Sequence, residues 1–160
     1  MGKEFKCYIT GTDRLLVRLV GDLNEFADLR AAGLPSSPSV EVDLSELRTI
    51  NSAGIREFLA WTSKIKNKDL SFSHCPKFFI DQVNMIAGLI PSQTKIVSFY
   101  VPFYCAELDK EKVAFYRSGL EFSVEQGIPQ IRHPVMEETN HKYVLDVDER
   151  SFFKFLTKFG

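Results

Sequence analysis

The chain has 160 residues, of which 44% are hydrophobic and 26% charged, with a formal net charge of -1. This length suits one well-buried core, and we expect one compact domain with an appendage rather than two large domains. The balanced charge argues against nucleic acid as a partner, and no apolar stretch approaches a membrane span, so we expect no direct membrane insertion. Three widely spaced cysteines, Cys7, Cys75 and Cys105, favour the reducing cytoplasm over a disulfide framework.

Two apolar segments open the chain. Residues 5–10 and 14–23 are rich in aliphatic and aromatic side chains and are separated by a short polar turn that contains glycine, so they predict a β-hairpin. Residues 24–34 follow with helical spacing between Asn24, a favoured N-cap residue, and Gly33, a favoured stop. A short helix is therefore expected there. Its inward side would carry Phe26, Leu29 and Leu34.

A strand leads through a polar corner into a helix in the next segment. Residues 40–44 alternate apolar and acidic side chains, which is the pattern of a strand with one buried face. Asn51 or Ser52 would cap the following helix, because either side-chain oxygen can accept from a free backbone N–H. The sole tryptophan, Trp61, is expected to pack beside the core. The helix face directed at the sheet would comprise Ile55, Phe58, Leu59, Thr62 and Ile65.

The same pattern occurs once more. Residues 70–75 predict a short strand, residues 76–90 a helix and residues 94–105 a long strand. Strands that alternate with helices predict an α/β fold, here a mixed sheet of about four to five strands with helices mainly on one side. We assign residues 1–104 to this core and residues 105–160 to a small α+β extension packed on it. The inward side of the second helix would carry Phe79, Val83, Ile86 and either Ala87 or Ile90.

The residues from Val42 to Trp61 carry a resemblance to a known family. Their sequence, VDLSELRTINSAGIREFLAW, resembles the central motif of STAS domains, the sulfate transporter and anti-sigma factor antagonist family. In that motif an apolar strand ends in an Asp-Leu-Ser-like turn and leads to Asp-Ser-Ser-Gly at the start of a helix. Here Asn51-Ser52-Ala53-Gly54 stands in that place. The order of expected elements over residues 5–104 also resembles that of a STAS domain.

The resemblance implies a non-catalytic protein-interaction module of bacterial signalling that has no cofactor. In the anti-sigma factor antagonists of the family, a serine kinase that doubles as the anti-sigma factor phosphorylates the first serine of the motif, and the matching position is Ser52. The unmodified face would bind this partner and phosphorylation would release it. A phosphoserine at a helix N-terminus meets free backbone N–H groups and the positive end of the helix dipole. The implied partner-binding residues are Asn51, Ser52, Gly54, Ile55, Arg56 and Phe58.

Two other interpretations of this corner stay open. Ser52 can be a helix cap without regulation, and the protein can be a constitutive scaffold subunit of a transporter or signalling assembly. The chain departs from the family in carrying Asn51 where the motif has Asp, which removes a carboxylate that could assist phosphorylation. Arg48 and Arg56 flank the corner and can pair with a phosphate. The sequence is also compatible with a homodimer, in which the partner is a second copy of this chain.

The C-terminal extension resembles a degenerate zinc-ribbon-like unit. Cys105 keeps the first ligand position and His133 stands at another, whereas Leu108 and Met136 replace the remaining two cysteines. Leucine cannot bind zinc and a thioether is a poor donor for it, so we expect no metal site. A rebuilt site is the alternative, and it would draw its further ligands from Asp109, Glu137 and His141.

Aromatic side chains are expected to replace the metal with a small hydrophobic core. They are Phe115, Tyr116, Phe122, Tyr143, Phe152, Phe153 and Phe155. The sequence contains no phosphate-binding loop, nucleophile elbow or helical pair of histidines, so we expect no enzyme. The pairs His74–Cys75 and Cys105–His133 favour structural roles. A pocket that brings one of these histidines or Cys105 together with a carboxylate would reopen the enzyme alternative.

Overall fold

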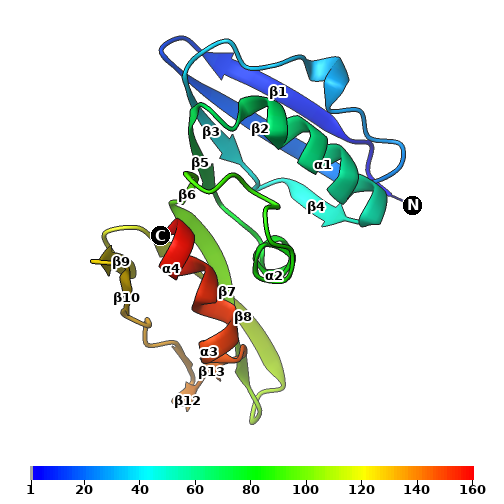
Figure 1. The fold of residues 1–160 in the computed structure, drawn as a ribbon. Helices are drawn as coiled ribbons and strands as arrows, with labels where there is room; N and C mark the ends of the chain where they lie inside the picture. Colours follow the sequence, from blue (N-terminus) through cyan, green and yellow to red (C-terminus); the bar gives the residue numbers. More distant parts are fainter. Residues whose placement is uncertain (1) are drawn as a thin grey trace.

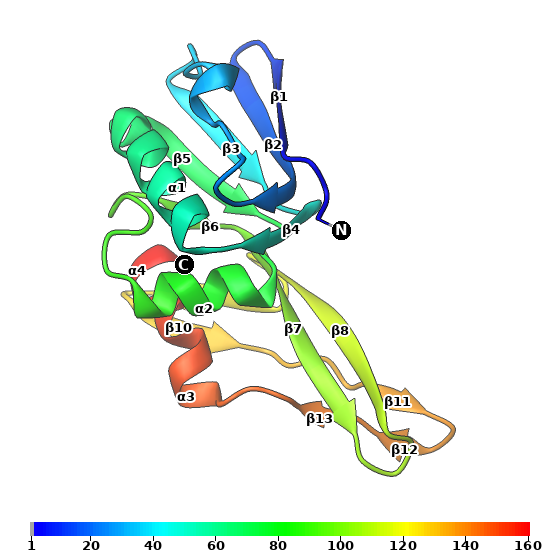
Figure 2. The ribbon, with the colours of Figure 1, turned by 90° about the vertical axis from the view of Figure 1, so that its right-hand side faces the viewer.

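The computed structural model describes residues 2–160. Figures 1 and 2 show a larger sheet built from the first half of the chain and a smaller sheet built from the second half. The protein is therefore a mixed α/β fold, as the alternation of strands and helices predicted. Within the described residues, no helix is both long and apolar enough to cross a membrane.

Six strands form the larger sheet. They are β1 (Lys6–Gly11), β2 (Arg14–Leu23), β3 (Ser39–Asp43), β4 (Leu47–Ile50), β5 (Asp69–Ser73) and β6 (Lys95–Ile96). Their order is β1-β2-β3-β5-β6, and β4 also pairs with β2. The predicted hairpin is confirmed, because β1 and β2 are antiparallel. All other pairs of this sheet are parallel, so the sheet is mixed.

Strand β4 is an element that the sequence analysis missed. β3 pairs with β2 over Arg14–Arg18, and β4 pairs with β2 over Gly21–Leu23. The two strands therefore follow one another along the same neighbour, interrupted by a turn in which the Gly21 N–H donates to the Glu46 carbonyl at 3.0 Å. This arrangement delivers the chain to the first residue of α1.

The two long helices occupy different places. Helix α1 (Ser52–Ile65) lies along one face of the larger sheet, whereas α2 (Lys77–Met85) lies at the junction of the two sheets. Helix α2 approaches β4 of the larger sheet and β7 of the smaller one. It is shorter than the predicted helix over residues 76–90, because the backbone leaves the helical region at Ile86. Phe79 and Val83 are buried as expected. Of the two alternatives for the last inward residue, Ala87 is exposed and Ile90 is buried, although both lie beyond the helix end.

The predicted helix over residues 24–34 is wrong. Only a 3-10 turn, η1 (Arg30–Ala32), forms in this segment. The reason lies in two side chains that bond to nearby backbone: Asn24 accepts from the Phe26 N–H, and Asp28 accepts from the N–H groups of Arg30 and Ala31. Such local bonds compete with the helical ladder. Phe26 is 88% exposed and Leu34 is 53% exposed, whereas Leu29 is buried.

The strand predicted over residues 94–105 is divided between the two sheets. Val97 still donates its N–H to the Phe72 carbonyl in the larger sheet. From the next residue, β7 (Ser98–Cys105) enters the smaller sheet, where it lies between β8 (Lys110–Arg117) and β13 (Val144–Leu145). The two sheets thus divide between Val97 and Ser98, before the boundary that was expected after residue 104. Strand β7, which was assigned to the core, is the central strand of the smaller sheet.

The remainder of the C-terminal half consists of two short hairpins and a helical end. The elements are β9 (Phe122–Glu125), β10 (Ile128–Ile131), β11 (Glu137–Glu138), β12 (His141–Lys142), α3 (Glu149–Phe152), η2 (Phe153–Phe155) and α4 (Leu156–Phe159). The expected aromatic core is present around Phe99, whose ring lies 5.0 Å from that of Phe155 and 5.1 Å from that of Phe122. Of the seven aromatic residues assigned to it, six are buried, and Phe115 lies half-buried on the other face of the sheet.

Candidate functional site

The corner between β4 and α1 is built around Asn51. Its backbone is extended, and its side-chain Oδ1 accepts from the Gly54 N–H at 3.0 Å, which makes Asn51 the N-cap of α1. The Asn51 N–H donates to the Leu23 carbonyl at 3.2 Å, and this bond ties the helix start to β2. Of the two residues that sequence analysis proposed as caps, Asn51 therefore performs the role.

Ser52 is the first residue of α1 and its side chain is exposed. Within residues 2–160 the Ser52 hydroxyl has no hydrogen-bond partner. Because the cap is supplied by its neighbour, a modification of this hydroxyl would not remove the capping bond. The hydroxyl is thus chemically available at the positive end of a 14-residue helix.

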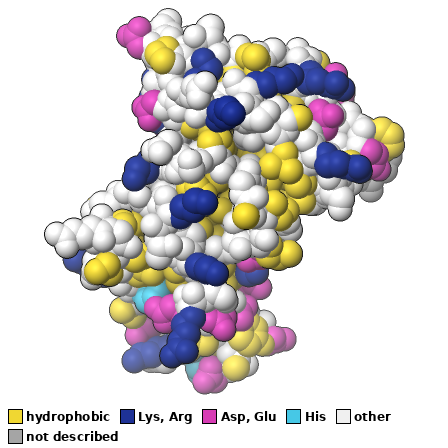
Figure 3. Space-filling model, viewed as in Figure 1, with side chains coloured by type: hydrophobic (Ala, Val, Ile, Leu, Met, Phe, Trp, Pro, Cys, Tyr) yellow, Lys and Arg dark blue, Asp and Glu magenta, His cyan; other side chains and the backbone are white. Residues whose placement is uncertain are grey.

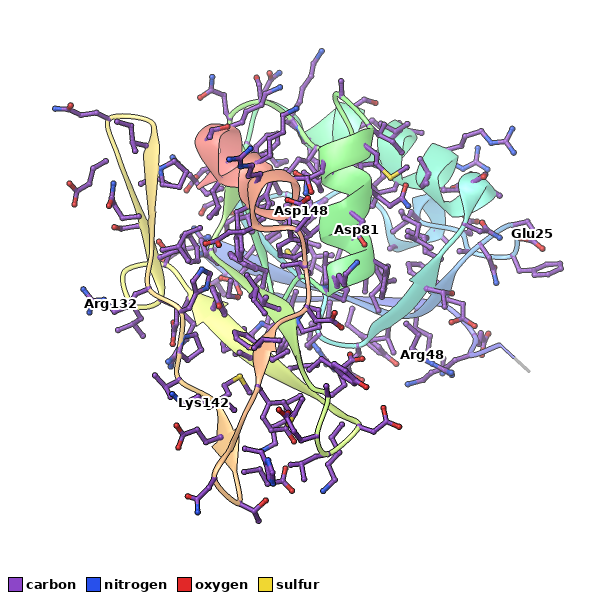
Figure 4. All side chains as sticks on the ribbon, turned by 90° about the horizontal axis from the view of Figure 1, so that it is seen from below. Glu25, Arg48, Asp81, Arg132, Lys142 and Asp148 are labelled. Carbon is purple, nitrogen blue, oxygen red and sulfur yellow. The ribbon has the colours of Figure 1, made fainter. Side chains whose placement is uncertain are left out.

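The amide of Asn51 makes a second contact at this corner. Its Nδ2 donates to Glu25 Oε2 at 2.8 Å, and this hydrogen bond lowers the pKa of the Glu25 carboxyl. An aspartate in place of Asn51 would keep the cap but would place a second carboxylate against Glu25. Asparagine is therefore the residue that can serve both contacts. Figure 4 shows Glu25 and Arg48 on the same side of the molecule, both directed away from the ribbon.

Gly54 is needed for the close approach of α1 to β2. It is buried, and a Cβ atom at this position would lie 1.9 Å from the Leu23 carbonyl oxygen. Phe58 is also buried, at 0% exposure, and its ring packs against Phe72 and Phe79 at 5.9 and 5.6 Å. These two residues were expected on the partner-binding face. Their burial corrects that expectation, because neither presents a side chain to a partner. Both instead pack in the interior beneath the corner.

Four of the six expected residues are left with side chains at the surface. Asn51, Ser52 and Arg56 are exposed and Ile55 is half-buried. Sequence analysis missed Phe26, which directly follows Glu25 and is thus carried to the same corner by the Asn51–Glu25 bond. The sequence signal for this exposure was Asn24. An asparagine can accept a hydrogen bond from the backbone N–H two residues later and so form a local turn instead of capping a helix.

Basic and apolar groups flank this corner. Arg48 and Arg56 are exposed, and neither forms an ion pair with another described residue. Figure 3 shows hydrophobic side chains gathered beside α1, over the region where α2 and its following loop lie in Figure 1. Half-buried Ile55 and Leu59 on α1 and the exposed Met85 on α2 are apolar groups of these elements. The corner therefore borders an apolar surface.

The two residues considered for a rebuilt metal site are far apart. Cys105 pairs with Lys110 at one end of the β7–β8 hairpin, whereas His133 bonds to Tyr116, which pairs with Phe99. Lys110 and Tyr116 are six residues apart along β8, which corresponds to about 20 Å of extended strand. Among residues 2–160, no group of three or more Cys, His, Asp or Glu residues could hold a metal. His133 instead links Tyr116 and Glu149, with both hydrogen bonds at 2.7 Å.

His74 does lie beside a carboxylate and a pocket. Its Nδ1 is 3.5 Å from Asp43 Oδ1, and a cavity of about 310 Å³ is lined by His74, Lys77 and Tyr100, among others. The ring is stacked on Phe115, with centroids 5.0 Å apart. Burial raises the pKa of the neighbouring Cys75 thiol well above its ordinary value, so Cys75 is not an activated nucleophile. The pocket thus brings a histidine together with a carboxylate, the condition set above for an enzyme. Ser45 and Lys77 also line it, and among the described residues neither side chain is hydrogen-bonded to His74.

The chain matches no protein-family model. It also has no match among curated proteins. The interpretation of the corner thus depends on its residues and geometry.

Proposed function

We propose that this protein is a STAS-like, non-catalytic interaction module of bacterial cytoplasmic signalling. Its docking surface is the corner face, which we define as Phe26, Asn51, Ser52, Ile55 and Arg56. An anti-sigma-like protein or serine kinase binds the corner face while Ser52 is unmodified. Phosphorylation of Ser52 then releases the partner.

The observation that carries the proposal is that Asn51 and Ser52 have different roles at the start of α1. Asn51 caps α1, and the Ser52 hydroxyl stands exposed beside it without an intramolecular partner. A phosphate on Ser52 can therefore be added without breaking the cap. The free N–H groups and dipole at the helix start favour the added negative charge.

The charges around Ser52 can accommodate a phosphate within the domain, so phosphorylation would act mainly on the binding of the partner. Exposed Arg48 and Arg56 can neutralise part of a phosphate charge of about -1.5 to -2 within the domain. Glu25, held by Asn51, adds one carboxylate to the corner. A partner with a carboxylate or a tightly packed apolar group at this point would be repelled or left with an unpaired charge. Couplings of about 1–3 kcal/mol, or five- to 150-fold in affinity, are typical of such switches.

The proposal is tested by quantitative capture from native cell lysate with four baits. They are the wild type, Ser52→Ala, Ser52→Asp and the matched control Ser63→Asp, which adds the same charge to an exposed serine at the far end of α1. We expect one partner to bind the wild type, Ser52→Ala and Ser63→Asp alike, and Ser52→Asp at least about fivefold less. Equal yield from all four folded baits would contradict the switch.

A constitutive scaffold is the second candidate, because the apolar surface beside α1 suits permanent docking as well. The two candidates differ in their response to Phe26→Ala and Ser52→Asp. Loss of the exposed Phe26 ring should weaken capture in both cases. Only the switch predicts that Ser52→Asp also weakens it.

A further inference from the structure

Strand β8 is the longest free edge among the sheets of the described chain. It has eight residues and pairs only with β7. The other edges of the two larger sheets are β1 with six residues, β4 with four, and β6 and β13 with two each. Figure 2 shows β8 along the outer side of the smaller sheet. A long unpaired edge is a template for pairing with another strand.

The outward backbone groups of β8 can be assigned from two hydrogen bonds. The Ser118 N–H donates to the Val97 carbonyl, toward β7. The Asp146 N–H donates to the Pro102 carbonyl, so the even-numbered residues of β7 face β13 and its odd-numbered residues face β8. Since directions alternate along a strand, Glu111, Val113, Phe115 and Arg117 direct their N–H and C=O groups away from β7. The Arg117 N–H donates to Glu121 Oε2 at 2.9 Å, and the Arg117 carbonyl accepts from the N–H groups of Leu120 and Glu121 at 3.1 Å. No hydrogen bond among the described residues uses the outward backbone groups of Glu111, Val113 and Phe115.

The usual protections of an edge strand are absent from the middle of β8. The strand contains no proline. Its two lysines, Lys110 and Lys112, are engaged with Glu138 at 2.8 and 3.2 Å. At the middle of the edge stands Val113, which is 56% exposed. Natural proteins block edges with charged side chains, prolines or bulges. The charges at outward positions of β8, Glu111 and Arg117, stand near its two ends, so its middle is open to a partner strand.

The strand is self-complementary about Ala114. Two antiparallel copies of β8 related by a twofold axis at this residue would place Val113 opposite Phe115 of the other copy, and Glu111 opposite Arg117. Val113 and Phe115 have free outward backbone groups, so each of the two central pairs can exchange two hydrogen bonds. The Glu111–Arg117 pairs contribute opposite charges, because the Arg117 backbone groups are already bonded within the turn that follows β8. Apolar pairs and opposite charges across strands are both stabilising. No two like charges oppose one another in this register.

We propose that the protein forms a homodimer through β8, in which the two smaller sheets join into one continuous six-stranded sheet. The occupant of the edge is thus a second copy of this chain. The dimer axis passes beside Ala114, and the interaction is independent of the proposed role of Ser52. A dimer of this kind presents two corner faces to its partners.

The test is sedimentation velocity of the full-length chain over a wide concentration range. We expect a monomer–dimer equilibrium in the wild type and a dissociation constant raised at least about tenfold by Val113→Pro. This proline removes an outward N–H and leaves the β7–β8 ladder intact. Val113→Lys should act in the same way, whereas the control Val144→Lys, at a residue 64% exposed on β13, should dimerise like the wild type.

A charge exchange separates edge pairing from mere destabilisation. Glu111→Arg alone would set arginines opposite one another and weaken the dimer, and Arg117→Glu alone would do the same with glutamates. The double variant restores opposite charges and should recover dimerisation, although the Arg117–Glu121 ion pair at 2.7 Å is lost in it. A wild type that stays monomeric at the highest concentration would overturn the proposal. So would a dimer unaffected by the changes at Val113 or not rescued by the exchange.

Discussion

Asn51 and Ser52 are neighbours of similar chemistry with different roles. Asn51 closes the first turn of α1, and Ser52 leaves its hydroxyl in solvent. We predict that Asn51→Ala lowers the free energy of unfolding by about 1 kcal/mol, because the Gly54 N–H loses its side-chain acceptor. Ser52→Ala should change it by less than about 0.5 kcal/mol. Urea unfolding of both variants decides the assignment, and a larger loss from Ser52→Ala would show that serine is the cap.

At this scale the sequence could indicate the corner but not assign its roles. Asn and Ser are both favoured caps, and only the backbone geometry selects one of them. The family resemblance placed Phe58 on the partner face, whereas the helical spacing had placed it toward the sheet, and its burial confirms the spacing. Phe58 is buried because it stands four residues after Gly54, on the helix side that approaches the sheet. Phe26 was assigned to a helix interior that does not form, so its 88% exposure was not foreseeable from spacing.

The short hairpin of β11 and β12 is anchored by Glu138. This carboxylate receives hydrogen bonds from Lys110, Tyr143 and Lys112, which lower its pKa to about 2. A carboxyl with a lowered folded-state pKa stabilises the protein above its unfolded pKa, and this stabilisation is lost as the pH falls through the folded value. We predict that the wild type loses stability between about pH 4.5 and pH 2 more steeply than Glu138→Gln. The control is Glu137→Gln, because Glu137 forms no ion pair within residues 2–160.

Urea midpoints measured across this pH range test the prediction. The pKa of Glu121 is also lowered to about 2, chiefly by Arg117. Every variant that retains Glu121 should therefore still lose some stability as the pH falls. A Glu138→Gln slope equal to that of the wild type would show that the anchor contributes nothing. A Glu137→Gln slope as shallow as that of Glu138→Gln would show that the effect is general.

Elements with a clear period were predictable, and those whose ends depend on tertiary contacts were not. The alternation before Asn51 and the helical spacing after it identified β3 and α1 within a residue or two. β4 escaped because four residues carry little periodicity, and two-residue strands such as β11 carry none. The division between β6 and β7 was hidden because an apolar run does not reveal that its neighbours change at Val97.

The two sheets of the molecule share one hydrophobic core. The Cys75 N–H donates to the Ser98 carbonyl at 3.1 Å, and the Cys75 carbonyl accepts from the Tyr100 N–H at 3.0 Å. Asn84 on α2 donates its side-chain amide to the Phe152 carbonyl at 2.8 Å. The buried side chains on both sides of this junction form a single cluster. We therefore expect the protein to unfold as one cooperative unit.

Phe99→Ala tests this coupling, because Phe99 lies in the smaller sheet and Trp61, 2% exposed, lies beside the larger one. We predict that the variant loses about 3–5 kcal/mol. The same loss should appear in Trp61 fluorescence and in far-ultraviolet circular dichroism. Phe26→Ala, the same change at an exposed position, should cost less than about 0.5 kcal/mol. A Trp61 transition that does not shift in Phe99→Ala would show two independent units.

Phosphorylation of Ser52 governs partner binding in the proposed switch. The most direct measurement is quantitative mass spectrometry of the chain purified from native cells, after its partner-bound and free forms have been separated. The account predicts phosphate on Ser52 in the free form and little or none in the bound form. An unmodified Ser52 in both forms, or equal phosphate in both, would contradict it.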